Sequence, residues 1–275
     1  MTEQNQQLKQ RFDEKGYVVV KNVFDLNEVE TIIRAFEGEW LKLVQQGEIS
    51  VRSTRPLESL YPRLRDYHRK NPVIMEQTLK AELFDLMKTI IGEEALVIST
   101  SYYFKSPTTR SLPLHQDNYA FGVSPGTTYA AWISLDYTNK ENGGLQFVPG
   151  TQTTDLSFPD ADPTNVKKYF SDTGQGLSVE EDQIEYVETE PGDVVIFNGN
   201  IIHGSTENTT DYQFRRCLLT HYTGESVERL ALNFNKLINR EGEKIRRRLN
   251  KDTKITQKQK SVFSIKEAGY FDSWK

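Results

Sequence analysis

The N-terminal third of the chain carries apolar residues at helical spacing. In residues 25–47 they recur every three or four positions, the pattern of an amphipathic helix that buries one face. Asp25 followed by Glu28 is a typical start of such a helix, and Gly47 is a typical end. A second helix of this kind is predicted over residues 72–92. The other elements predicted in this third are a short polar helix over 3–12 and a strand over 16–24.

From about Leu96 the pattern changes to short runs rich in Val, Ile, Tyr and Phe, separated by Gly, Pro and Asn. Such runs are typical of strands, and many of them at irregular spacing favour an antiparallel sandwich or jelly roll. Residues 153–182 interrupt the strands with a segment too long for a hairpin, which is typical of a lid or binding loop. The strands are predicted within residues 95–105, 127–138, 143–150, 182–190, 192–205 and 214–223.

These patterns predict a mainly β fold with flanking helices. No internal repeat, low-complexity linker or clear boundary divides the chain, so we expect one domain over residues 1–275. It would comprise a mainly helical part over 1–95, a jelly-roll core over 96–224 and a basic, helical C-terminal segment over 225–275.

Composition narrows the class of protein. A hydrophobic fraction of 36% with 11% aromatic residues is typical of a globular chain. The polar start lacks the apolar core of a signal peptide, and no run of 18 apolar residues occurs, so we expect a soluble, cytoplasmic protein with no membrane partner. Cys217 is the only cysteine, which excludes an internal disulfide and a cysteine-held zinc cluster. Any metal must be bound by His, Asp and Glu.

Charge is unevenly distributed behind a net value of -5. Residues 151–195 hold eleven acids against two lysines, whereas residues 226–275 hold thirteen Lys and Arg against six acids. The basic tail admits a nucleic-acid partner, but overall acidity opposes phosphate binding and favours a solvated surface. We therefore expect no nucleic-acid partner.

His115 and Asp117 lie two positions apart in a predicted strand, where alternate residues share a face about 7 Å apart at the backbone. Two ligands hold a transition metal poorly, so a third is needed. His203 is favoured because it ends an apolar strand where the chain opens into a loop, while His221 is the alternative and otherwise a core histidine or a partner of a ligand. His68, among charged residues, is expected at the surface. Two histidines and one carboxylate form the facial arrangement that holds non-haem Fe(II) with open positions.

Arg215 and Arg216 lie in the last predicted strand and must point to opposite faces, so only one can face the interior. An interior guanidinium requires a planar anion, and the distal carboxylate of 2-oxoglutarate fits it as a bidentate pair. The alternative is two exposed basic residues on an edge strand.

Four ordered stretches, "PLHQD", "AAWISLDYTNKENGGLQFVPGT", "PGDVVIFNGNIIHGSTEN" and "FRRCLLTHY", resemble the motifs of the phytanoyl-CoA dioxygenase family of Fe(II)/2-oxoglutarate oxygenases. The resemblance covers roughly residues 95–224 and implies a double-stranded β-helix, a cupin-like barrel. It also implies iron, 2-oxoglutarate as cosubstrate and dioxygen. By this resemblance the iron ligands are His115, Asp117 and His203, and the cosubstrate contacts are Arg215, Ser205 and Trp132.

Two departures from the family pattern stand out. Gln152 replaces a histidine of the family's usual "PGSH" or "PGTH", and the spacing from His203 to Arg215 is one residue longer, which a bulge or longer turn near residues 209–212 would absorb. Asp117 itself separates the chain from related halogenases, which have a small residue there, so halogenation is disfavoured.

The resemblance implies hydroxylation of an unactivated C–H bond in a small metabolite or biosynthetic intermediate, with release of succinate and CO2. The alternatives are desaturation, cyclisation or epoxidation by the same chemistry, a non-catalytic metal-binding jelly roll, and a demethylase of nucleic acid or hydroxylase of protein. Arg63, Arg65 and Arg69 are expected to be solvated. Candidates for lining the barrel mouth are Lys105, Arg110, Tyr102, Tyr103, Tyr119 and Phe121.

Overall fold

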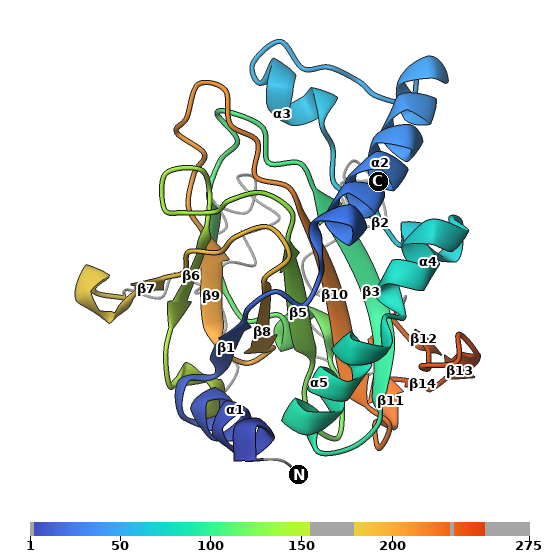
Figure 1. The fold of residues 1–275 in the computed structure, drawn as a ribbon, viewed down its shortest axis with the longest axis vertical. Helices are drawn as coiled ribbons and strands as arrows, with labels where there is room; N and C mark the ends of the chain where they lie inside the picture. Colours follow the sequence, from blue (N-terminus) through green and yellow to red (C-terminus); the bar gives the residue numbers. More distant parts are fainter. Residues whose placement is uncertain (1–2, 155–178, 232–233, 251–275) are drawn as a thin grey trace, which may run out of the picture.

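Two antiparallel sheets face each other and enclose the centre of the molecule in the computed structural model, which describes residues 3–154, 179–231 and 234–250. The major sheet has the order β1-β8-β5-β10-β3-β12-β13, with β2 also paired to β3, and the minor sheet has the order β4-β9-β6-β7 (Figure 1). The strands of the major sheet are β1 (Tyr17–Val20), β2 (Leu64–Arg65), β3 (Ala95–Tyr103), β5 (Tyr129–Ser134), β8 (Val194–Asn198), β10 (Cys217–Gly224), β12 (Lys236–Ile238) and β13 (Lys244–Arg246). Those of the minor sheet are β4 (Leu112–His115), β6 (Leu145–Val148), β7 (Glu185–Tyr186) and β9 (Ile202–Ser205), while β11 (Arg229–Leu230) and β14 (Arg248–Leu249) pair separately.

Helices cover the outer face of the major sheet on the side of β3 (Figure 1). The capping box predicted at Asp25 is present, because its carboxylate accepts from Glu28 N at 2.8 Å and Glu28 Oε2 accepts from Asp25 N at 2.8 Å. Phe36 of α2 is fully buried and stacks on Tyr102 of β3, with ring centroids 4.1 Å apart. The helices are α1 (Glu3–Lys15), α2 (Leu26–Gln45), α3 (Pro56–Leu60), α4 (Pro72–Thr78), α5 (Ala81–Ile91) and α6 (Asn118–Phe121), and short 3-10 turns lie at 67–69, 151–153 and 181–183.

The single helix expected over residues 72–92 is two helices, α4 and α5, separated at Leu79 and Lys80. The hydroxyl of Thr78 donates to the carbonyl of Ile74 at 2.7 Å, a bond that competes with the continuing helix. Both helices still bury an apolar face in the same cluster as α2.

The space between the two sheets holds a second apolar cluster. Trp132 of β5, Phe197 of β8 and Leu219 of β10 come from the major sheet, and Leu145 and Phe147 of β6 come from the minor sheet. Alternate residues of the same strands, such as Ile133 and Leu218, belong instead to the cluster under the helices. The sheets therefore close around an interior, as the jelly-roll prediction requires.

The prediction of a helical segment after residue 224 is wrong for the part that the structure describes. Residues 225–231 and 234–250 contain the short strands β11 to β14, and β12 and β13 extend the edge of the major sheet. Leu230 and Leu237 are buried in a third apolar cluster together with Leu96 and Ile98 of β3. The remaining part of that prediction, residues 251–275, lies outside the described residues, as do residues 155–178 of the expected insert.

His68 is not a surface residue. It is 1% exposed, and its Nδ1 lies 2.8 Å from Thr100 Oγ1 on the outer face of β3. Burial lowers its pKa to about 4, so the ring is neutral at neutral pH. The charged neighbours in the sequence do not predict this position because the packing partner lies on a distant strand.

Within the described helices, no segment has the length and apolar character needed to span a membrane.

Candidate active site

Three side chains of the predicted metal set converge inside the barrel. His115 ends β4 and is the direct cross-strand partner of His203 in β9, with their ring centroids 4.3 Å apart. Asp117 Oδ1 lies 3.3 Å from His115 Nε2, and Asp117 Oδ2 lies 3.6 Å from His203 Nε2. One ligand atom from each residue fits within a 4.8 Å span, which is suitable for one shared cation.

The geometry behind this cluster differs from the predicted one. The strand β4 ends at His115, and Asp117 has φ -59 and ψ -41, at the start of the one-turn helix α6. Its carbonyl accepts from Ala120 N at 2.9 Å, which fixes this turn. The prediction that His115 and Asp117 share a face of one strand is therefore wrong, and a helical turn brings the carboxylate back toward the imidazole.

Backbone carbonyls fix the orientation of both imidazoles. His115 Nδ1 lies 2.9 Å from Pro113 O, and His203 Nδ1 lies 3.0 Å from Ile201 O. A carbonyl can only accept, so each Nδ1 carries the proton and each neutral ring presents a lone pair at Nε2. Both lone pairs point to the carboxylate of Asp117, an arrangement that repels unless a cation lies between the groups. Two imidazole nitrogens and one carboxylate suit Fe(II), so the residues present fit a non-haem iron ion.

Electrostatics in the cluster favour an ionised carboxylate and a neutral His203, and they raise the pKa of His115. Burial alone would raise the pKa of Asp117, but the nearby His221, His203 and His115 hold it well below its usual value. Burial and the neighbouring His115 lower the pKa of His203 to about 4. For His115, burial acts to lower the pKa, yet the hydrogen bond and charge of Asp117 raise it overall. A divalent cation would replace the proton that His115 shares with Asp117.

His221 holds Asp117 from the opposite sheet. Its Nε2 lies 3.0 Å from Asp117 Oδ2, and it comes from β10, whereas the other three groups come from β4, β9 and the turn after β4. Its ring also packs on Phe121 of α6 at 4.5 Å between centroids. Of the two histidines that the sequence leaves open, His203 belongs to the cluster of ligand atoms and His221 orients the carboxylate.

Arg215 faces the interior and Arg216 does not. Both residues precede β10 instead of lying on it, but they point to opposite sides as predicted. Arg215 is 3% exposed, and its Nε donates to Gly143 O at 3.0 Å. Arg216 binds Asp136 on the outer side, with Nη2 2.7 Å from Oδ1. Between His203 and Arg215 the chain bends at residues 211–212, and Asn208 Nδ2 closes this bend by donating to Gln213 O at 2.7 Å.

The other two predicted cosubstrate contacts also lie inside the barrel. The guanidinium carbon of Arg215 is 5.3 Å from the ring of Trp132, which is 2% exposed in the interior cluster. Ser205 is buried on β9, two residues beyond His203, and its hydroxyl accepts from Lys105 Nζ at 2.9 Å. The sequence indicates Lys105 only as a candidate for lining the mouth, because a single lysine after a strand carries no motif.

The expectations about the residues at the barrel mouth and about the three solvated arginines are met only in part. Tyr102 is fully buried under α2 and does not line the interior. Arg63 is engaged rather than solvated, because its Nε and Nη2 donate to Ser101 Oγ at 3.0 and 2.7 Å and its guanidinium lies 5.0 Å from the ring of Tyr103. Arg65 and Arg69 are exposed, as expected, and they also contact protein, through the ring of Phe234 at 5.3 Å and the carbonyl of Lys236 at 2.7 Å.

Gln152, at the position where the family pattern has a histidine, is used for packing. Its Nε2 donates to the carbonyl of Asp13 at 2.8 Å and so ties the turn after β6 to the end of α1. Gly16 lies against the same side chain, and a Cβ there would be 2.4 Å from Gln152 Oε1.

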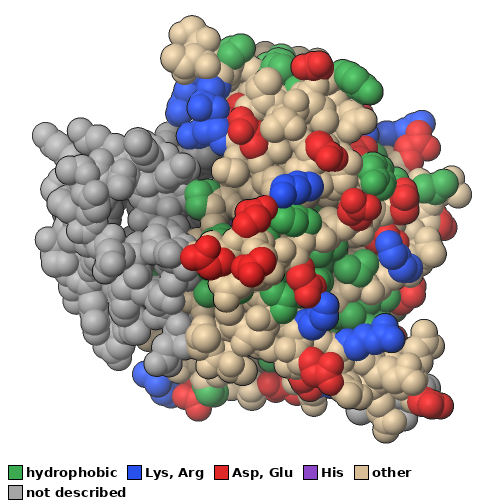
Figure 2. Space-filling model, turned by 90° about the vertical axis from the view of Figure 1, so that its left-hand side faces the viewer, with side chains coloured by type: hydrophobic (Ala, Val, Ile, Leu, Met, Phe, Trp, Pro, Cys, Tyr) green, Lys and Arg blue, Asp and Glu red, His purple; other side chains and the backbone are tan. Residues whose placement is uncertain are grey.

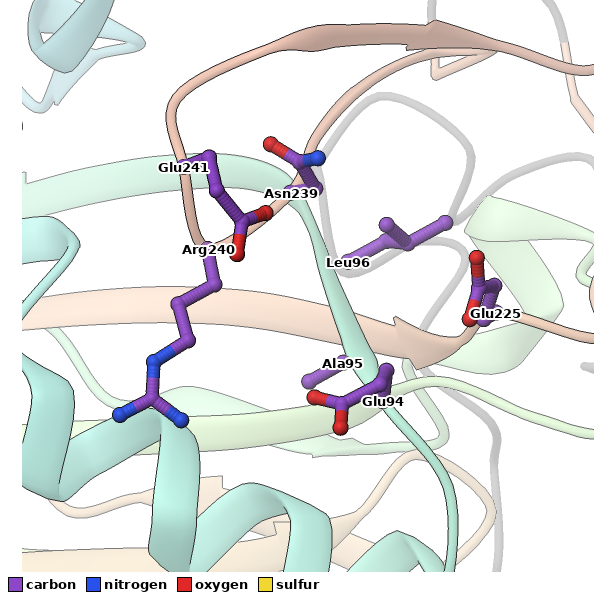
Figure 3. Close-up of a pocket in the computed structure, with 7 residues that line it drawn as sticks. All are labelled: Glu94, Ala95, Leu96, Glu225, Asn239, Arg240 and Glu241. Atoms are coloured by element: carbon purple, nitrogen blue, oxygen red, sulfur yellow. The ribbon is translucent and has the colours of Figure 1, made fainter.

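A surface hollow elsewhere takes no part in this cluster. It lies between the start of β3, the end of β10 and the turn after β12 (Figure 3). None of the six predicted site residues lines it. Its lining residues are Glu94, Ala95, Leu96, Glu225, Asn239, Arg240 and Glu241.

Comparison with known proteins decides the family. The family model described as phytanoyl-CoA dioxygenase (PhyH) matches residues 12–217, which include the whole metal cluster and Arg215. The chain belongs to the PhyH family of Fe(II)/2-oxoglutarate-dependent oxygenases. This PhyH-family protein is accordingly a 2-oxoglutarate-dependent non-haem iron dioxygenase.

Individual relatives agree with the family. The peroxisomal phytanoyl-CoA dioxygenase of Homo sapiens is 26% identical over 236 residues, which cover 78% of this chain and 68% of that protein. The structure of EctD from S. alaskensis with 2-oxoglutarate and 5-hydroxyectoine superposes with a TM-score of 0.64 at 20% identity, covering 83% of this chain and 78% of that one. The epimerase SnoN, in complex with Fe3+, alpha ketoglutarate and nogalamycin RO, gives a TM-score of 0.62 at 21% identity, covering 82% of this chain and 85% of that one. These likenesses confirm the double-stranded β-helix.

Proposed function

We propose that this PhyH-family protein hydroxylates an unactivated C–H bond of a small metabolite or biosynthetic intermediate, with release of succinate and CO2. The observation that supports it most directly is the convergence of two Nε2 lone pairs and one ionised carboxylate within 4.8 Å. The neighbouring buried Arg215 and Ser205 supply the polar groups that a dicarboxylic cosubstrate needs.

In this proposal His115, Asp117 and His203 would hold Fe(II), which a set of two imidazoles and one carboxylate suits. Bound there, iron supplies the redox chemistry that couples decarboxylation of 2-oxoglutarate to oxidation of the substrate. The carbonyls of Pro113 and Ile201 keep both imidazole rings in the tautomer that can bind a metal through Nε2. The hydrogen bond from His221 restricts rotation of the Asp117 carboxylate.

Arg215 would bind the distal carboxylate of 2-oxoglutarate, with the Ser205 hydroxyl beside it and Trp132 against the guanidinium. The Nε of Arg215 is already held by Gly143 O and its Nη1 donates to Cys217 Sγ at 2.8 Å, which leaves Nη2 and the second hydrogen of Nη1 for the ligand. The bonds of Arg216 to Asp136 argue against this role for Arg216.

Asp117 also supports oxygenation over halogenation. Its carboxylate faces both imidazoles and is held by His221, so it occupies the place that a halide ligand would need. The expectation of hydroxylation rather than chlorine or bromine transfer follows from this occupancy.

A small-molecule substrate is supported by the two structural relatives, whose crystals hold 5-hydroxyectoine and nogalamycin RO. For nucleic acid as the substrate, the described surface offers little. Figure 2 shows Lys and Arg side chains interspersed with Asp and Glu over the described part of one face, with no continuous positive stripe there.

The test is succinate formation from 2-oxoglutarate by the Fe(II)-loaded protein, alone and with a panel of small amphipathic and anionic metabolites. We expect slow succinate release without substrate and faster release with a correct one. A product 16 mass units heavier indicates hydroxylation or epoxidation, and one 2 units lighter indicates desaturation or ring closure.

The matched variants are His203→Gln and His68→Gln, which alter one buried histidine inside the cluster and one outside it. Only the first should abolish succinate formation. Succinate formation that is absent from the wild-type protein under all conditions, or equal in both variants, would refute the proposal and favour a non-catalytic metal-binding protein.

A further inference from the structure

Two arginines at the edge of the major sheet point toward the inside of the barrel. Arg65 of β2 is paired with Ser101 of β3, which is itself paired with Leu219 of the interior cluster. Leu64 belongs instead to the cluster under the helices. Because alternate residues of a strand share a face, Arg63 and Arg65 lie on the inner side. The guanidinium of Arg63 confirms this direction, since its Nε and Nη2 donate to Ser101 Oγ at 3.0 and 2.7 Å.

Both arginines lie near the metal cluster. The guanidinium of Arg63 is 5.0 Å from the ring of Tyr103, the next inward residue of β3. The charges of Arg63, Asp117 and Arg65 all act on this tyrosine. Arg63 also acts on His115, where its charge opposes that of Asp117. The two cations therefore border the space around the ligand atoms and do not merely decorate the outer surface.

Aromatic rings connect the second arginine to the same cluster. The guanidinium of Arg65 lies 5.3 Å from the ring of Phe234. Phe234 packs on Phe121 at 4.4 Å between centroids, and Phe121 packs on His221 at 4.5 Å. His221 in turn binds the carboxylate of Asp117. A row of rings thus leads from the exposed Arg65 to the metal ligands and offers apolar surface along the way.

The strongest charge that acts on Arg65 is another cation. Arg63 repels it more strongly than Asp66, the adjacent acid, attracts it. Asp66 is held by β3, because its Oδ1 accepts from Thr100 N at 3.0 Å. Within residues 3–154, 179–231 and 234–250, no carboxylate forms an ion pair with Arg65. Two like charges held side by side are unfavourable, and an anion bound beside them offsets the repulsion.

We propose that Arg63 and Arg65 bind the acidic group of the substrate, a carboxylate or a phosphate, while its apolar body packs on the half-buried rings of Tyr103 and Phe234. A planar guanidinium suits either group, because it can donate two parallel hydrogen bonds to a pair of oxygens. This inference rests on the proposed function and narrows its substrate to small organic anions with an apolar body. The half-buried Arg63 should contribute more than the exposed Arg65, where solvent screens the charge.

The test is calorimetric binding to the full chain loaded with Mn(II) and 2-oxoglutarate, with two matched pairs of probes. One pair is 4-phenylbutyrate and its neutral amide, and the other is 2-phenylethyl phosphate and 2-phenylethanol. We expect the charged member of at least one pair to bind about 10-fold or more tightly than its neutral partner, as a hydrogen bond to a charged group allows. The pair with the larger ratio shows whether the acid is a carboxylate or a phosphate.

The variants remove one guanidinium at a time. Arg63→Met should reduce the ratio between charged and neutral probe to less than about threefold, and Arg65→Met should reduce it by a smaller factor. Arg34→Met, at an exposed arginine on α2, is the matched control and should keep the wild-type ratio. The affinity for 2-oxoglutarate itself should stay unchanged in all three variants.

Three results would overturn the inference. The first is that neither charged probe binds the wild type more tightly than its neutral partner, and the second is that the ratio survives Arg63→Met. The third is a loss of 2-oxoglutarate affinity in Arg63→Met, which would assign this arginine to the cosubstrate. Arg63→Gln, which can still donate to Ser101, replaces the methionine variant if that one does not fold, and the same loss of ratio is expected. Failure of the wild type to bind Mn(II) or 2-oxoglutarate would instead refute the proposed function itself.

Discussion

The two faces of the major sheet are made from the same strands and differ in what they bury. On the outer face, Tyr102 and Leu218 pack with Phe36 in an apolar cluster that joins the sheet to the helices. On the inner face, Tyr103 lies under the guanidinium of Arg63, and His221 holds the carboxylate of Asp117. Successive residues of one strand thus serve stability and chemistry in turn.

The two faces contribute differently to the stability of the protein and to its affinity for ligands. The outer face gains stability from apolar area removed from water, so smaller side chains there leave cavities. The inner face buries polar and charged groups whose favourable partners include a metal and an anion. Substitutions on the outer face should therefore lower the free energy of unfolding without changing ligand affinity. Substitutions on the inner face should change ligand affinity and leave the free energy of unfolding nearly unchanged.

The largest effect is expected from Phe36→Ala on the outer face. Phe36 is fully buried and stacked on Tyr102, so its loss should lower the free energy of unfolding by about 3–5 kcal/mol. Urea denaturation measures this, and Mn(II) affinity below the transition should match that of the wild type. A loss under about 1 kcal/mol, or a changed metal affinity, would contradict the division between the faces.

Acid should destabilise the outer face through His68. Its pKa of about 4 in the folded protein lies below the ordinary value of 6.5, so the unfolded chain binds the proton first as the pH falls. The resulting stability is complete above about pH 6.5 and is lost between 6.5 and 4, to about 3 kcal/mol in total. The difference in unfolding free energy between the wild type and His68→Gln, measured across this range, should shrink toward acid; a constant difference would mean that burial does not shift the pKa of His68.

Asp117→Asn should abolish tight metal binding while leaving the fold intact. Loss of the negative charge between two neutral imidazoles should weaken Mn(II) binding by at least about 100-fold, since changes at partners of metal ligands already cost 10- to 100-fold. Asp136→Asn, which alters the carboxylate bound to Arg216 on the outer side, is the control and should retain metal affinity. Equal metal affinity in the two variants would remove Asp117 from the site.

His221→Phe should have the smallest of these effects. The ring volume is kept against Phe121, but the hydrogen bond to Asp117 Oδ2 is lost, and metal affinity should fall about 10-fold. The affinity of the metal-loaded protein for 2-oxoglutarate should stay unchanged, because His221 acts only through the carboxylate. A change in cosubstrate affinity with normal metal affinity would reverse this assignment.

Much of the fold and the three clustered residues could be predicted because the signals are local. The strand runs are apolar and bounded by Gly and Pro, and His115 and His203 lie in such runs, with Asp117 just after the first of them. The sequence alone does not show which of Arg215 and Arg216 points into the barrel. In the structure Arg216 binds Asp136 on the outer side of the sheet.

What the sequence did not predict depends on distant partners. His68 is buried by Thr100, and the basic segment over residues 225–250 forms strands because β12 pairs with β3. Asp117 reaches the cluster through a helical turn, although strand alternation gave the same two residues for another reason. Lys105 lacks any motif, and the burial of its side chain depends on the room left by Gly143, which lies in a different part of the chain.

Because His115 and His203 are cross-strand partners, a metal ion bound to both would stabilise the minor sheet. The strand β4 is the edge of the minor sheet and is registered on β9 only through Leu112 with Ser205 and His115 with His203, with an irregularity between them. An ion bound to both histidines cross-links this edge to its neighbour. Depletion of the ion should therefore raise amide hydrogen exchange in β4 and β9 first and expose an unpaired strand to other chains, so that the metal-free protein aggregates before it unfolds.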